Sequence, residues 1–501
     1  MVIVMLAITR RGASWIMAQS KMNNPVIRFS GRCVFSSSNS EKCVGRTGLD
    51  NDIFAPRGAR KVAVIGSGIS GLSAAWLLSR HCDVTLYEAD DRLGGHANTV
   101  DIRFGLDVIS VDTGFIVYND RNYPNLVALF KHLGVPTDDS NMSFAASLDD
   151  GRFEYSGCGL SGLLGQRSNA FRPRFWRMVS DILRFYKQAP GLLERKDLET
   201  ATIGDYLETN RYSRAFVEDH LMPMGAAIWS SSADDMRGYP LHAFIRFFVN
   251  HGLVVLKDRP QWRTVRGGSR EYVSRLLADF KGTVRRNTPI ASVTRIGGRV
   301  TVTDTHGHSD LYSDVVIATH ANQALALLSD ADQRERALLG AFDYTPNTAV
   351  LHSDIRLMPK RRQVWASWNY IAAHQQSGQS PLCVTYWMNQ LQNIDSSMSL
   401  FVTLNPSRDI NPTKIHRTFH YAHPLFDQKA MAAQKQLWQL QGRHNTWFCG
   451  AHFGAGFHED GLQSGLAAAE GLAGIRRPWS VKDESARIHL GPRFPNLMAA
   501  E

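Results

Sequence analysis

The sequence has few cysteines, and none of them lies in a pattern that is typical of a binding site. The chain of 501 residues has no C-x-x-C pair, and its six cysteines are scattered: Cys33, Cys43, Cys82, Cys158, Cys383 and Cys449. Such spacing is typical of reduced, unpaired thiols and excludes the common cysteine-based zinc sites. The 18 histidines include no H-E-x-x-H pattern, so the sequence predicts no metal centre.

Long hydrophobic runs are also missing. No apolar stretch reaches the roughly 20 residues that a membrane-spanning helix needs. A hydrophobic content of 44% with 20% charged residues is typical of a globular protein. A chain of 501 residues is too long for one compact core, so we expect more than one domain.

Acidic residues are scarce at the N-terminus. Residues 1–49 contain seven Lys or Arg and one Glu, which gives this segment +6 of the total net charge of +10. The remaining +4 is too small to indicate a nucleic-acid-binding surface. The Ser- and Arg-rich leader suits a transit peptide, a disordered extension, or residues upstream of the true start codon. Apart from a possible targeting role of this leader, we expect a cytoplasmic protein.

The most informative segment is Lys61–Ala75. An apolar run of strand length breaks into Gly66, Gly68 and Gly71 and then continues with a helix-like pattern. Gly66 permits a tight turn, Gly68 lets a phosphate approach the backbone, and Gly71 lets the helix pack on the strand. The N-terminus of the helix offers free N–H groups to the anion. This pattern predicts a dinucleotide site.

A second apolar run and a second pair of glycines refine this prediction. Asp83–Tyr87 ends in Glu88, at a suitable spacing for a carboxylate that binds the ribose hydroxyls. The following Ala89–His96 contains Gly94 and Gly95. An NAD site has no need of this pair, whereas flavoproteins with two dinucleotide-binding motifs use it to bring the chain close to the cofactor. The pair therefore favours FAD.

Together these segments resemble the FAD-dependent amine oxidase and phytoene desaturase superfamily. The resemblance rests on Gly66–Ala75, Glu88, Arg92-x-Gly94-Gly95, Val111–Phe115, Asn287–Val293, Asp314–Thr319 and Trp447–Leu466. It implies an α/β fold in which a Rossmann-like, two-dinucleotide-binding FAD domain carries an inserted α+β substrate domain. It also implies a set of cofactor-binding residues: Gly66, Ser67, Gly68, Ile69, Ser70, Gly71, Glu88, Ala89, Arg92, Gly94, Gly95, His96, Thr113, Gly114, Ile290, Gly450, Asp460, Gly461 and Leu462.

Three positions depart from the family pattern. His96 and Asp90 stand where amine oxidases commonly have arginines, and Ala451 follows Gly450 where an acidic residue is usual. No Cys or His stands out for covalent attachment, so we expect noncovalent FAD. With these departures the chain resembles a side branch of the superfamily. The members of this branch are little-characterised oxidoreductases that resemble the N-terminal part of some plant cyclopropane fatty acid synthases.

The FAD segments are far apart, so each domain must be assembled from several pieces. We expect a leader at 1–57, FAD-binding parts at 58–119, 263–345 and 440–478, substrate-domain parts at 120–262 and 346–439, and a C-terminal tail at 479–501. The first substrate segment is largely helical in pattern. Its Arg174–Lys187 stretch places Phe175, Val179, Ile182 and Tyr186 at spacings of three and four.

Aromatic residues gather in three segments outside the cofactor motifs. Phe171–Met178 alternates with arginines, which fits either peripheral contact with an anionic membrane or a buried face with a solvated back. Trp365–Tyr370 and Thr385–Asn389 fit either the wall of a substrate pocket or inward residues of a packed sheet.

The function that the resemblance implies is hydride transfer to flavin N5 from a small amine or a lipid-like CH–CH substrate. The alternatives are a redox-neutral flavin isomerase and a non-catalytic FAD-binding subunit of a lipid-modifying system. Flavin chemistry leaves few fixed catalytic side chains to find, and none is predicted here. His96, His458 and Glu459 either lie near the flavin or are structural. The oligomeric state stays open.

Overall fold

The computed structural model describes residues 60–491, except 257, 373–381 and 396. The predicted leader, with Cys33 and Cys43, therefore lies outside the described residues. By their contacts the described residues all belong to one unit, Arg57–Glu501.

A five-stranded parallel sheet forms the base of the cofactor-binding part. Its strand order is β10 (Thr283–Arg285), β2 (Asp83–Tyr87), β1 (Lys61–Ile65), β14 (Asp314–Ile317) and β20 (Thr446–Phe448). β1 and β14 are almost continuous apolar runs because both faces of the sheet are covered. Ile65 is in register with both Tyr87 and Ile317, so three strands end together. Ligands bind at this carboxyl edge in open α/β sheets.

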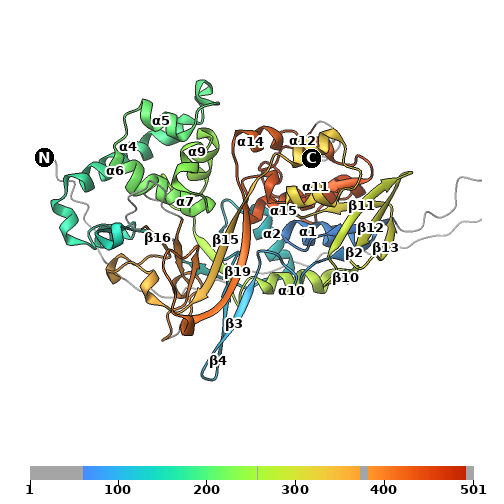
Figure 1. Cartoon of the computed structure of the whole chain (residues 1–501), viewed down its shortest axis with the longest axis horizontal. Helices are drawn as coiled ribbons and strands as arrows, with labels where there is room; N and C mark the ends of the chain where they lie inside the picture. Colours follow the sequence, from blue (N-terminus) through green and yellow to red (C-terminus); the bar gives the residue numbers. More distant parts are fainter. Residues whose placement is uncertain (1–59, 257, 373–381, 396, 492–501) are drawn as a thin grey trace, which may run out of the picture. The chain divides into compact units, whose positions relative to one another are not determined.

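Four helices accompany this sheet: α1 (Ile69–Leu78), α2 (Pro124–Leu133), α10 (Arg270–Asp279) and α15 (His458–Ala473). α1 is buried along its whole length, because it lies against both β1 and α15 (Figure 1). The two helices approach closely at glycines. A Cβ on Gly465 would come within 2.1 Å of the Ser70 carbonyl oxygen, and one on Gly461 within 2.8 Å of Ile69 Cγ2. Small residues thus place the N-terminus of α15 beside that of α1.

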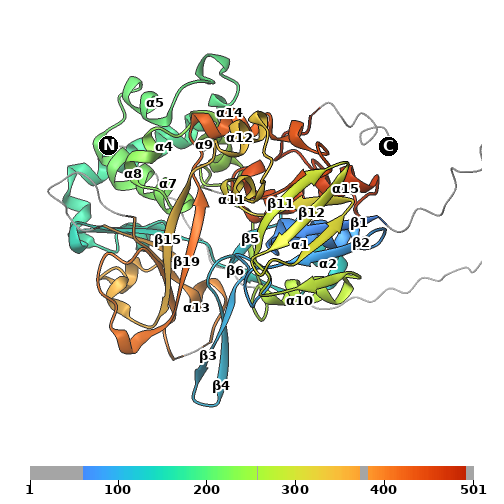
Figure 2. The ribbon, with the colours of Figure 1, turned by 45° about the vertical axis from the view of Figure 1, so that its right-hand side comes forward.

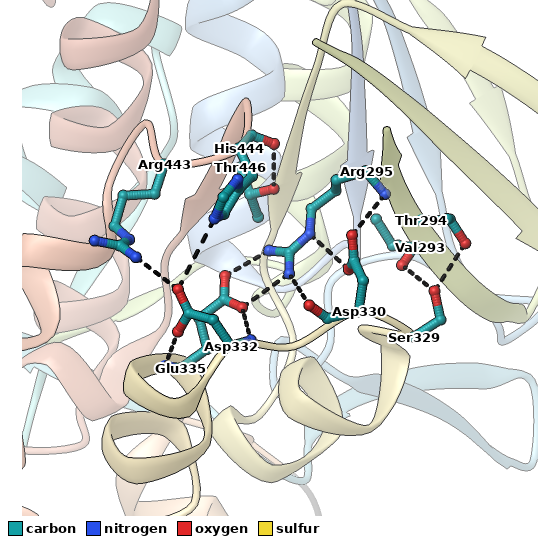
Figure 3. Close-up of polar contacts among 10 residues, drawn as sticks. All are labelled: Val293, Thr294, Arg295, Ser329, Asp330, Asp332, Glu335, Arg443, His444 and Thr446. Atoms are coloured by element: carbon teal, nitrogen blue, oxygen red, sulfur yellow. Dashed lines mark hydrogen bonds and ion pairs between the residues drawn. The ribbon is translucent and has the colours of Figure 1, made fainter. Parts of the chain in front are cut away.

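A three-stranded antiparallel sheet, β11 (Ile290–Ile296), β12 (Arg299–Asp304) and β13 (Ser309–Tyr312), lies over α11 (Ala321–Leu327) and is followed in sequence by α12 (Gln333–Leu339). Arg295 of β11 donates to both oxygens of Glu335 at 2.5 and 2.8 Å, and to Asp330 at 2.8 Å (Figure 3). Both Arg295 and Glu335 are buried, and Asp332 joins Arg443 to the same network at 2.6 Å. These ion pairs fix β11, α12 and the turn before β20 to one another.

A seven-stranded mixed sheet forms much of the second half of the molecule. Its order is β19 (Ile415–Pro424), β15 (Tyr344–His352), β18 (Phe401–Leu404), β17 (Val384–Trp387), β16 (Trp368–Ile371), β7 (Phe144–Leu148) and β8 (Phe153–Ser156). All neighbours are antiparallel except β16 and β7. The long strands β15 and β19 run side by side between the helices α4–α9, within residues 173–250, and the sheets that contain β1 and β11 (Figures 1 and 2).

The smaller elements complete the chain. β3 (Thr99–Phe104) and β4 (Asp107–Asp112) form a hairpin that projects from the body (Figure 2), and β5 (Val117–Asn119), β9 (Trp262–Val265) and β6 (Thr137–Ser140) form a three-stranded sheet. The remaining helices are α3 (Gly159–Leu163), α4 (Pro173–Leu192), α5 (Ile203–Thr209), α6 (Arg214–Phe216), α7 (Met222–Trp229), α8 (Ala233–Arg237), α9 (Leu241–Asn250), α13 (Met388–Leu391) and α14 (Gln428–Gln434), and a π-helical segment at Val217–Leu221 joins α6 to α7.

The predicted helix at Arg174–Lys187 is present within α4. Phe175 is fully buried, whereas Ile182 and Tyr186 are half-buried. Pro173 starts the helix, where its missing N–H costs nothing. Around the basic segment, Phe171 is 87% and Trp176 50% exposed. The segment is therefore neither wholly a buried face nor wholly an exposed one.

The predicted domain limits stay a prediction, and two sets of contacts connect the predicted parts. The segment 120–262 is not only helical, because it contributes β6, β7 and β8, and its α2 packs on α10 and α15 of the FAD-binding part. The predicted tail is anchored up to its described end. Arg487 pairs with Asp460 of α15, and Ile488 is buried. Periodicity revealed the helices, but not which neighbours would cover their apolar faces.

Candidate active site

The glycine turn lies between the end of β1 and the start of α1. Gly66 has φ +100°, which favours glycine, and a Cβ on Gly71 would lie 1.9 Å from the Gly66 carbonyl oxygen. Gly68 differs, because a Cβ there would meet no protein atom within 4 Å. Gly66 and Gly71 are therefore required by the turn itself, whereas Gly68 keeps open the space in front of the helix N-terminus. An anionic phosphate fits this space.

Glu88 lies beside this turn. Its Oε2 accepts hydrogen bonds from the backbone N–H of Ser67 at 2.9 Å and from the Ser67 hydroxyl at 2.5 Å, while Oε1 accepts from Asp90 N–H at 3.0 Å. The carboxylate thus fixes the turn and also lines the cavity described below.

The second glycine pair touches the first turn. Gly94 donates its N–H to the Ser67 carbonyl at 3.1 Å, and a Cβ on Gly95 would come within 3.0 Å of Gly68 Cα. Arg92 Nη1 donates to the Gly95 carbonyl at 2.7 Å. The two glycine motifs, about 25 residues apart in sequence, therefore form one continuous backbone surface.

The C-terminal segment closes the site from the other side. β20 pairs with β14, and the Gly450 N–H donates to the Ser464 hydroxyl of α15 at 3.0 Å. Asp460 caps the helix by accepting the Phe457 N–H at 2.7 Å. Arg487, a residue of the predicted tail, lies 2.6 Å from Asp460. The start of α15 is thereby held at the carboxyl edge of the sheet.

These segments line one cavity of about 1480 Å³. Fifteen of the predicted cofactor residues line it: Gly66, Ser67, Gly68, Ile69, Ser70, Glu88, Ala89, Arg92, Gly95, His96, Thr113, Gly114, Ile290, Gly450 and Gly461. Gly71, Gly94, Asp460 and Leu462 do not line it. The first two allow close backbone packing, Asp460 caps α15, and Leu462 is fully buried in the core. Pockets that bind one drug-sized ligand have about 300–1,000 Å³, so this cavity has room for a dinucleotide and a substrate.

The three residues that the sequence placed either near the flavin or in structural positions separate in the structure. His96 and His458 line the cavity, whereas the Glu459 carboxylate is buried elsewhere and accepts hydrogen bonds from Asn125 and Leu126. His96 stacks on Tyr421 with ring centroids 5.0 Å apart, and its Nε2 is buried with no hydrogen-bond partner. Burial, with a contribution from His423, holds the pKa of His96 well below its usual value.

An unpartnered buried nitrogen, an open Gly68 and two adjacent helix N-termini are the features that a bound dinucleotide would use. The His96 nitrogen needs a polar ligand atom to compensate for its burial. The N-termini of α1 and α15 both favour negative charge. The residues present therefore fit FAD.

The rest of the cavity is lined by the seven-stranded sheet and by the helical region. We use the term helical section for the lining residues within 159–163, 182–186, 220–230 and 247–262. Most are apolar or aromatic, including Leu163, Ile182, Met224, Ile228 and Trp229. From the two aromatic segments predicted at 365–370 and 385–389, Trp368 and Tyr386 line the cavity. They are cross-strand partners with rings 5.0 Å apart.

Two histidines of the helical section were not indicated as site residues by the sequence. His251 Nδ1 lies 2.9 Å from the Phe247 carbonyl, which can only accept, so Nδ1 carries the proton and Nε2 a lone pair. His220 Nδ1 bonds to the Tyr155 hydroxyl at 2.9 Å, and that hydroxyl donates to the Asp219 carbonyl at 2.8 Å. Nε2 of each histidine is buried without a partner.

Burial lowers the pKa of His251 to about 3 and that of His220 to about 4. Both side chains are therefore neutral acceptors at physiological pH. No motif or spacing marks either residue, because their positions at the cavity depend on contacts that form only in the folded chain.

Known proteins show where this architecture belongs. The model of a family described as flavin containing amine oxidoreductase matches residues 69–473. The chain belongs to this family. The match confirms the predicted family and, with it, the predicted flavin cofactor.

Individual curated relatives match only short stretches of the chain. A stretch of 52 residues is 52% identical to protoporphyrinogen oxidase 2, chloroplastic/mitochondrial, of Arabidopsis thaliana, and the match covers 10% of this chain and 10% of the plant protein. The chain thus matches about a tenth of the length of that relative.

Two solved structures share the fold. The CLA-producing fatty acid isomerase from P. acnes aligns with a TM-score of 0.57 and 16% identity, covering 84% of this chain and 100% of that one. Cyclohexylamine oxidase from Brevibacterium oxydans IH-35A aligns with a TM-score of 0.58 and 14% identity, covering 83% and 99%. This confirms the predicted α/β fold with a Rossmann-like FAD-binding domain. In the described part of the chain, no helix is both long and apolar enough to cross a bilayer.

Proposed function

We propose that this flavoenzyme oxidises a lipid-like substrate by hydride transfer from a C–H bond. The observation that carries the proposal is the single cavity that joins the dinucleotide-binding segments to an extended apolar and aromatic section. When bound, FAD supplies the redox chemistry, because its N5 accepts the hydride. The protein then has to hold the cofactor, exclude water and orient the substrate.

The chain's own groups are suited to these tasks. The N-terminus of α1 faces the phosphate space in front of Gly68, and the N-terminus of α15 favours negative charge on the flavin side of the cavity. Apolar side chains of the helical section exclude water from the reacting atoms. We propose that the predicted residues lining the cavity bind FAD, and that Gly71, Gly94, Asp460 and Leu462 support them from behind.

Few polar groups are available to orient a substrate in the helical section. The lone pairs of His220 and His251 and the Trp229 indole N–H are buried without a partner. Each can form one hydrogen bond to the substrate. The desolvation cost of that bond is small on the protein side, because each group is already buried away from water. His251 also stacks on Phe247 at 3.8 Å, which fixes its ring.

An amine is the second substrate class that the family suggests, and Trp368 and Tyr386 offer aromatic faces to a cationic group. The charge of the helical section favours the lipid. Among the described residues that line this section, none is a carboxylate. A protonated amine would therefore have no counter-ion there, whereas an acyl chain would find the apolar surface that it needs.

The test is an anaerobic titration of the purified yellow holoprotein with acyl lipids and alkyl amines of matched chain length. We expect lipids to bleach the oxidised flavin spectrum. Met224→Trp should abolish bleaching by filling the helical section while flavin content stays unchanged, and Met224→Leu, which conserves volume, should behave like the natural protein. Bleaching by amines alone would contradict the lipid assignment.

The same titration separates two other functions. A redox-neutral isomerase would convert an unsaturated lipid to a product of equal mass without lasting bleaching. The fatty acid isomerase of similar fold makes this outcome worth measuring by mass spectrometry. A non-catalytic FAD-binding subunit would bind lipid with neither bleaching nor product.

A further inference from the structure

The helical section of the cavity contains one charged lining residue among those described, Arg259. The other charged lining residues, Glu88, Asp90, Asp91 and Arg92, belong to the glycine-motif end of the cavity. A single cation in an otherwise apolar section indicates a ligand that carries an anionic group, because a wholly apolar ligand gains nothing from the charge.

Arg259 is held in place and keeps its terminal nitrogens available. Its Nε donates to the Val255 carbonyl at 3.0 Å, which fixes the plane of the guanidinium group. Within the described part of the chain, no carboxylate pairs with it, unlike Arg263 and Arg266 that follow, which pair with Asp139 and Asp138. Arg259 is exposed and lines the cavity, and its terminal Nη1 and Nη2 have no carboxylate partner among the described residues. A guanidinium group offers two parallel N–H donors that fit a carboxylate or phosphate.

The charge lies beside the cavity wall. Burial raises the pKa of Tyr186, and the positive charge of Arg259 opposes that shift. Tyr186 lines the cavity one helical turn after Ile182, so the guanidinium is close to the apolar path formed by α4.

Exposed leucines belong to the same helical section or follow it in sequence. Leu160 of α3 is 77% exposed and Leu256 is 66% exposed, yet both line the cavity. Leu183, which is 50% exposed, follows Ile182 on α4. Residues that both line a cavity and face solvent mark its opening. The opening therefore combines an apolar lip with one unpaired cation.

We propose that Arg259 binds the anionic head group of an amphipathic substrate whose apolar chain lies in the helical section. The head group is a carboxylate or a phosphate, held at the opening while the chain extends toward the flavin end. This inference rests on the proposed function, since it concerns the substrate of the same cavity. It also predicts a preference against amines, because Arg259 repels a cationic head.

The experiment measures binding to the holoprotein with three probes of equal chain length: a fatty acid, its methyl ester and the alkyl amine. Quenching of tryptophan fluorescence reports binding, since Trp229 and Trp368 line the cavity. We expect the acid to bind about 10- to 100-fold more tightly than the ester, as for a charge-assisted hydrogen bond. Arg259→Ala should reduce affinity for the acid to that of the ester, and Arg259→Glu should make the amine the preferred ligand.

Arg246→Ala is the matched control, because Arg246 is an exposed arginine of α9 that does not line the cavity. It should leave the preference for the acid unchanged. Flavin content should be equal in all variants, because Arg259 lies outside the glycine motifs. Equal affinity of the natural protein for acid and ester, or equal effects of Arg259→Ala and Arg246→Ala, would overturn the inference.

Two further arms identify the source of the anion. Fatty acid below its micelle concentration supplies a free carboxylate, and vesicles of phosphatidylglycerol or phosphatidylcholine supply membrane phosphates. If Arg259→Ala loses only the binding of free fatty acid, the head group is a carboxylate, and if it loses only the binding of phosphatidylglycerol vesicles, the head group is a membrane phosphate. If it loses neither, the inference is overturned. If the acid preference is present but no lipid bleaches the flavin or is converted, the head-group site stands and the proposed oxidation fails.

Discussion

Arg487 lies 2.6 Å from Asp460, the residue that caps the first turn of α15. Asp460 is fully buried and the Arg487 side chain is 20% exposed. Burial raises the pKa of Asp460, and the charge of Arg487 opposes that shift. The C-terminal segment therefore neutralises a buried carboxylate in the first turn of α15, next to Gly461, which lines the cavity.

Removing Arg487 should be costly for this reason. Arg487→Met leaves a buried carboxylate without its partner, and such changes cost about 3–5 kcal/mol of unfolding free energy. The measurement is urea unfolding with excess FAD, combined with flavin content, which should fall because Gly461 of the same turn lines the cavity.

Arg476→Met is the control for this change. Arg476 and Glu484 form a more exposed pair, so its loss should cost about 0–1 kcal/mol. Asp460→Asn in the Arg487→Met background should recover part of the lost stability, because it removes the uncompensated charge. If the two single arginine variants are equally stable, the Asp460 pair is not important for the fold.

Two glycines of one turn should respond differently to substitution. A Cβ on Gly71 would overlap the Gly66 carbonyl, whereas one on Gly68 would meet no protein atom within 4 Å. Gly71→Val should therefore lower the unfolding free energy by about 1–3 kcal/mol or more. Gly68→Val should preserve stability without FAD and reduce FAD affinity by at least about tenfold, because the side chain enters the phosphate space.

Circular dichroism melting of the flavin-free protein and FAD titration separate these two effects. Gly191→Val is a control for the β-branched residue alone, since a Cβ there also meets nothing within 4 Å but lies in α4. Full FAD binding by Gly68→Val would show that the phosphates do not approach this residue.

Much of the cofactor end could be predicted from sequence because its constraints are local. A turn that must have φ +100° at Gly66 and no side chain at Gly68 leaves a readable pattern within a few residues. The substrate end depends on long-range contacts. His251 and Arg259 come near the cavity only because α9 packs on α4, and no periodicity encodes that. Likewise the ion pair of Asp460 with Arg487 joins α15 to the C-terminal segment, and no local pattern in the sequence indicates it.

Buried histidines should make the protein sensitive to mild acid. Burial lowers the pKa of His251 and His458 to about 3 and that of His220 to about 4, whereas an unfolded histidine titrates near about 6.5. Below that pH the unfolded chain binds protons that the folded chain does not. Stability should therefore be unaffected by these groups above about pH 6.5 and fall by about 1.4 kcal/mol per pH unit for each histidine as the pH decreases toward 4.

His251→Phe tests this assignment, because a phenyl ring retains the stacking on Phe247. At neutral pH the variant should lose about 1 kcal/mol with the hydrogen bond to the Phe247 carbonyl. Between pH 6 and 4.5 its unfolding free energy should fall less steeply with decreasing pH than that of the natural protein. The difference in slope should correspond to about one proton fewer taken up on unfolding. Denaturant unfolding at several pH values gives the slopes, and the exposed His81→Asn is the control. An unchanged slope in His251→Phe would mean that this histidine is already protonated in the folded protein.

Glu88 holds the glycine turn through both of its oxygens, and it is the residue for which charge and geometry can be separated most cleanly. Oε2 accepts from the N–H and the hydroxyl of Ser67, and Oε1 accepts from Asp90 N–H. Glu88→Gln keeps the shape but replaces one acceptor by a donor, so either Ser67 or Asp90 loses its partner. We expect FAD affinity to fall about tenfold, as for one lost charge-assisted bond near 1.5 kcal/mol. Ser67→Ala removes only the hydroxyl contact and should have a smaller effect. If Ser67→Ala weakens FAD binding as much as Glu88→Gln, the carboxylate acts only by orienting Ser67, and it makes no contact with the cofactor of its own.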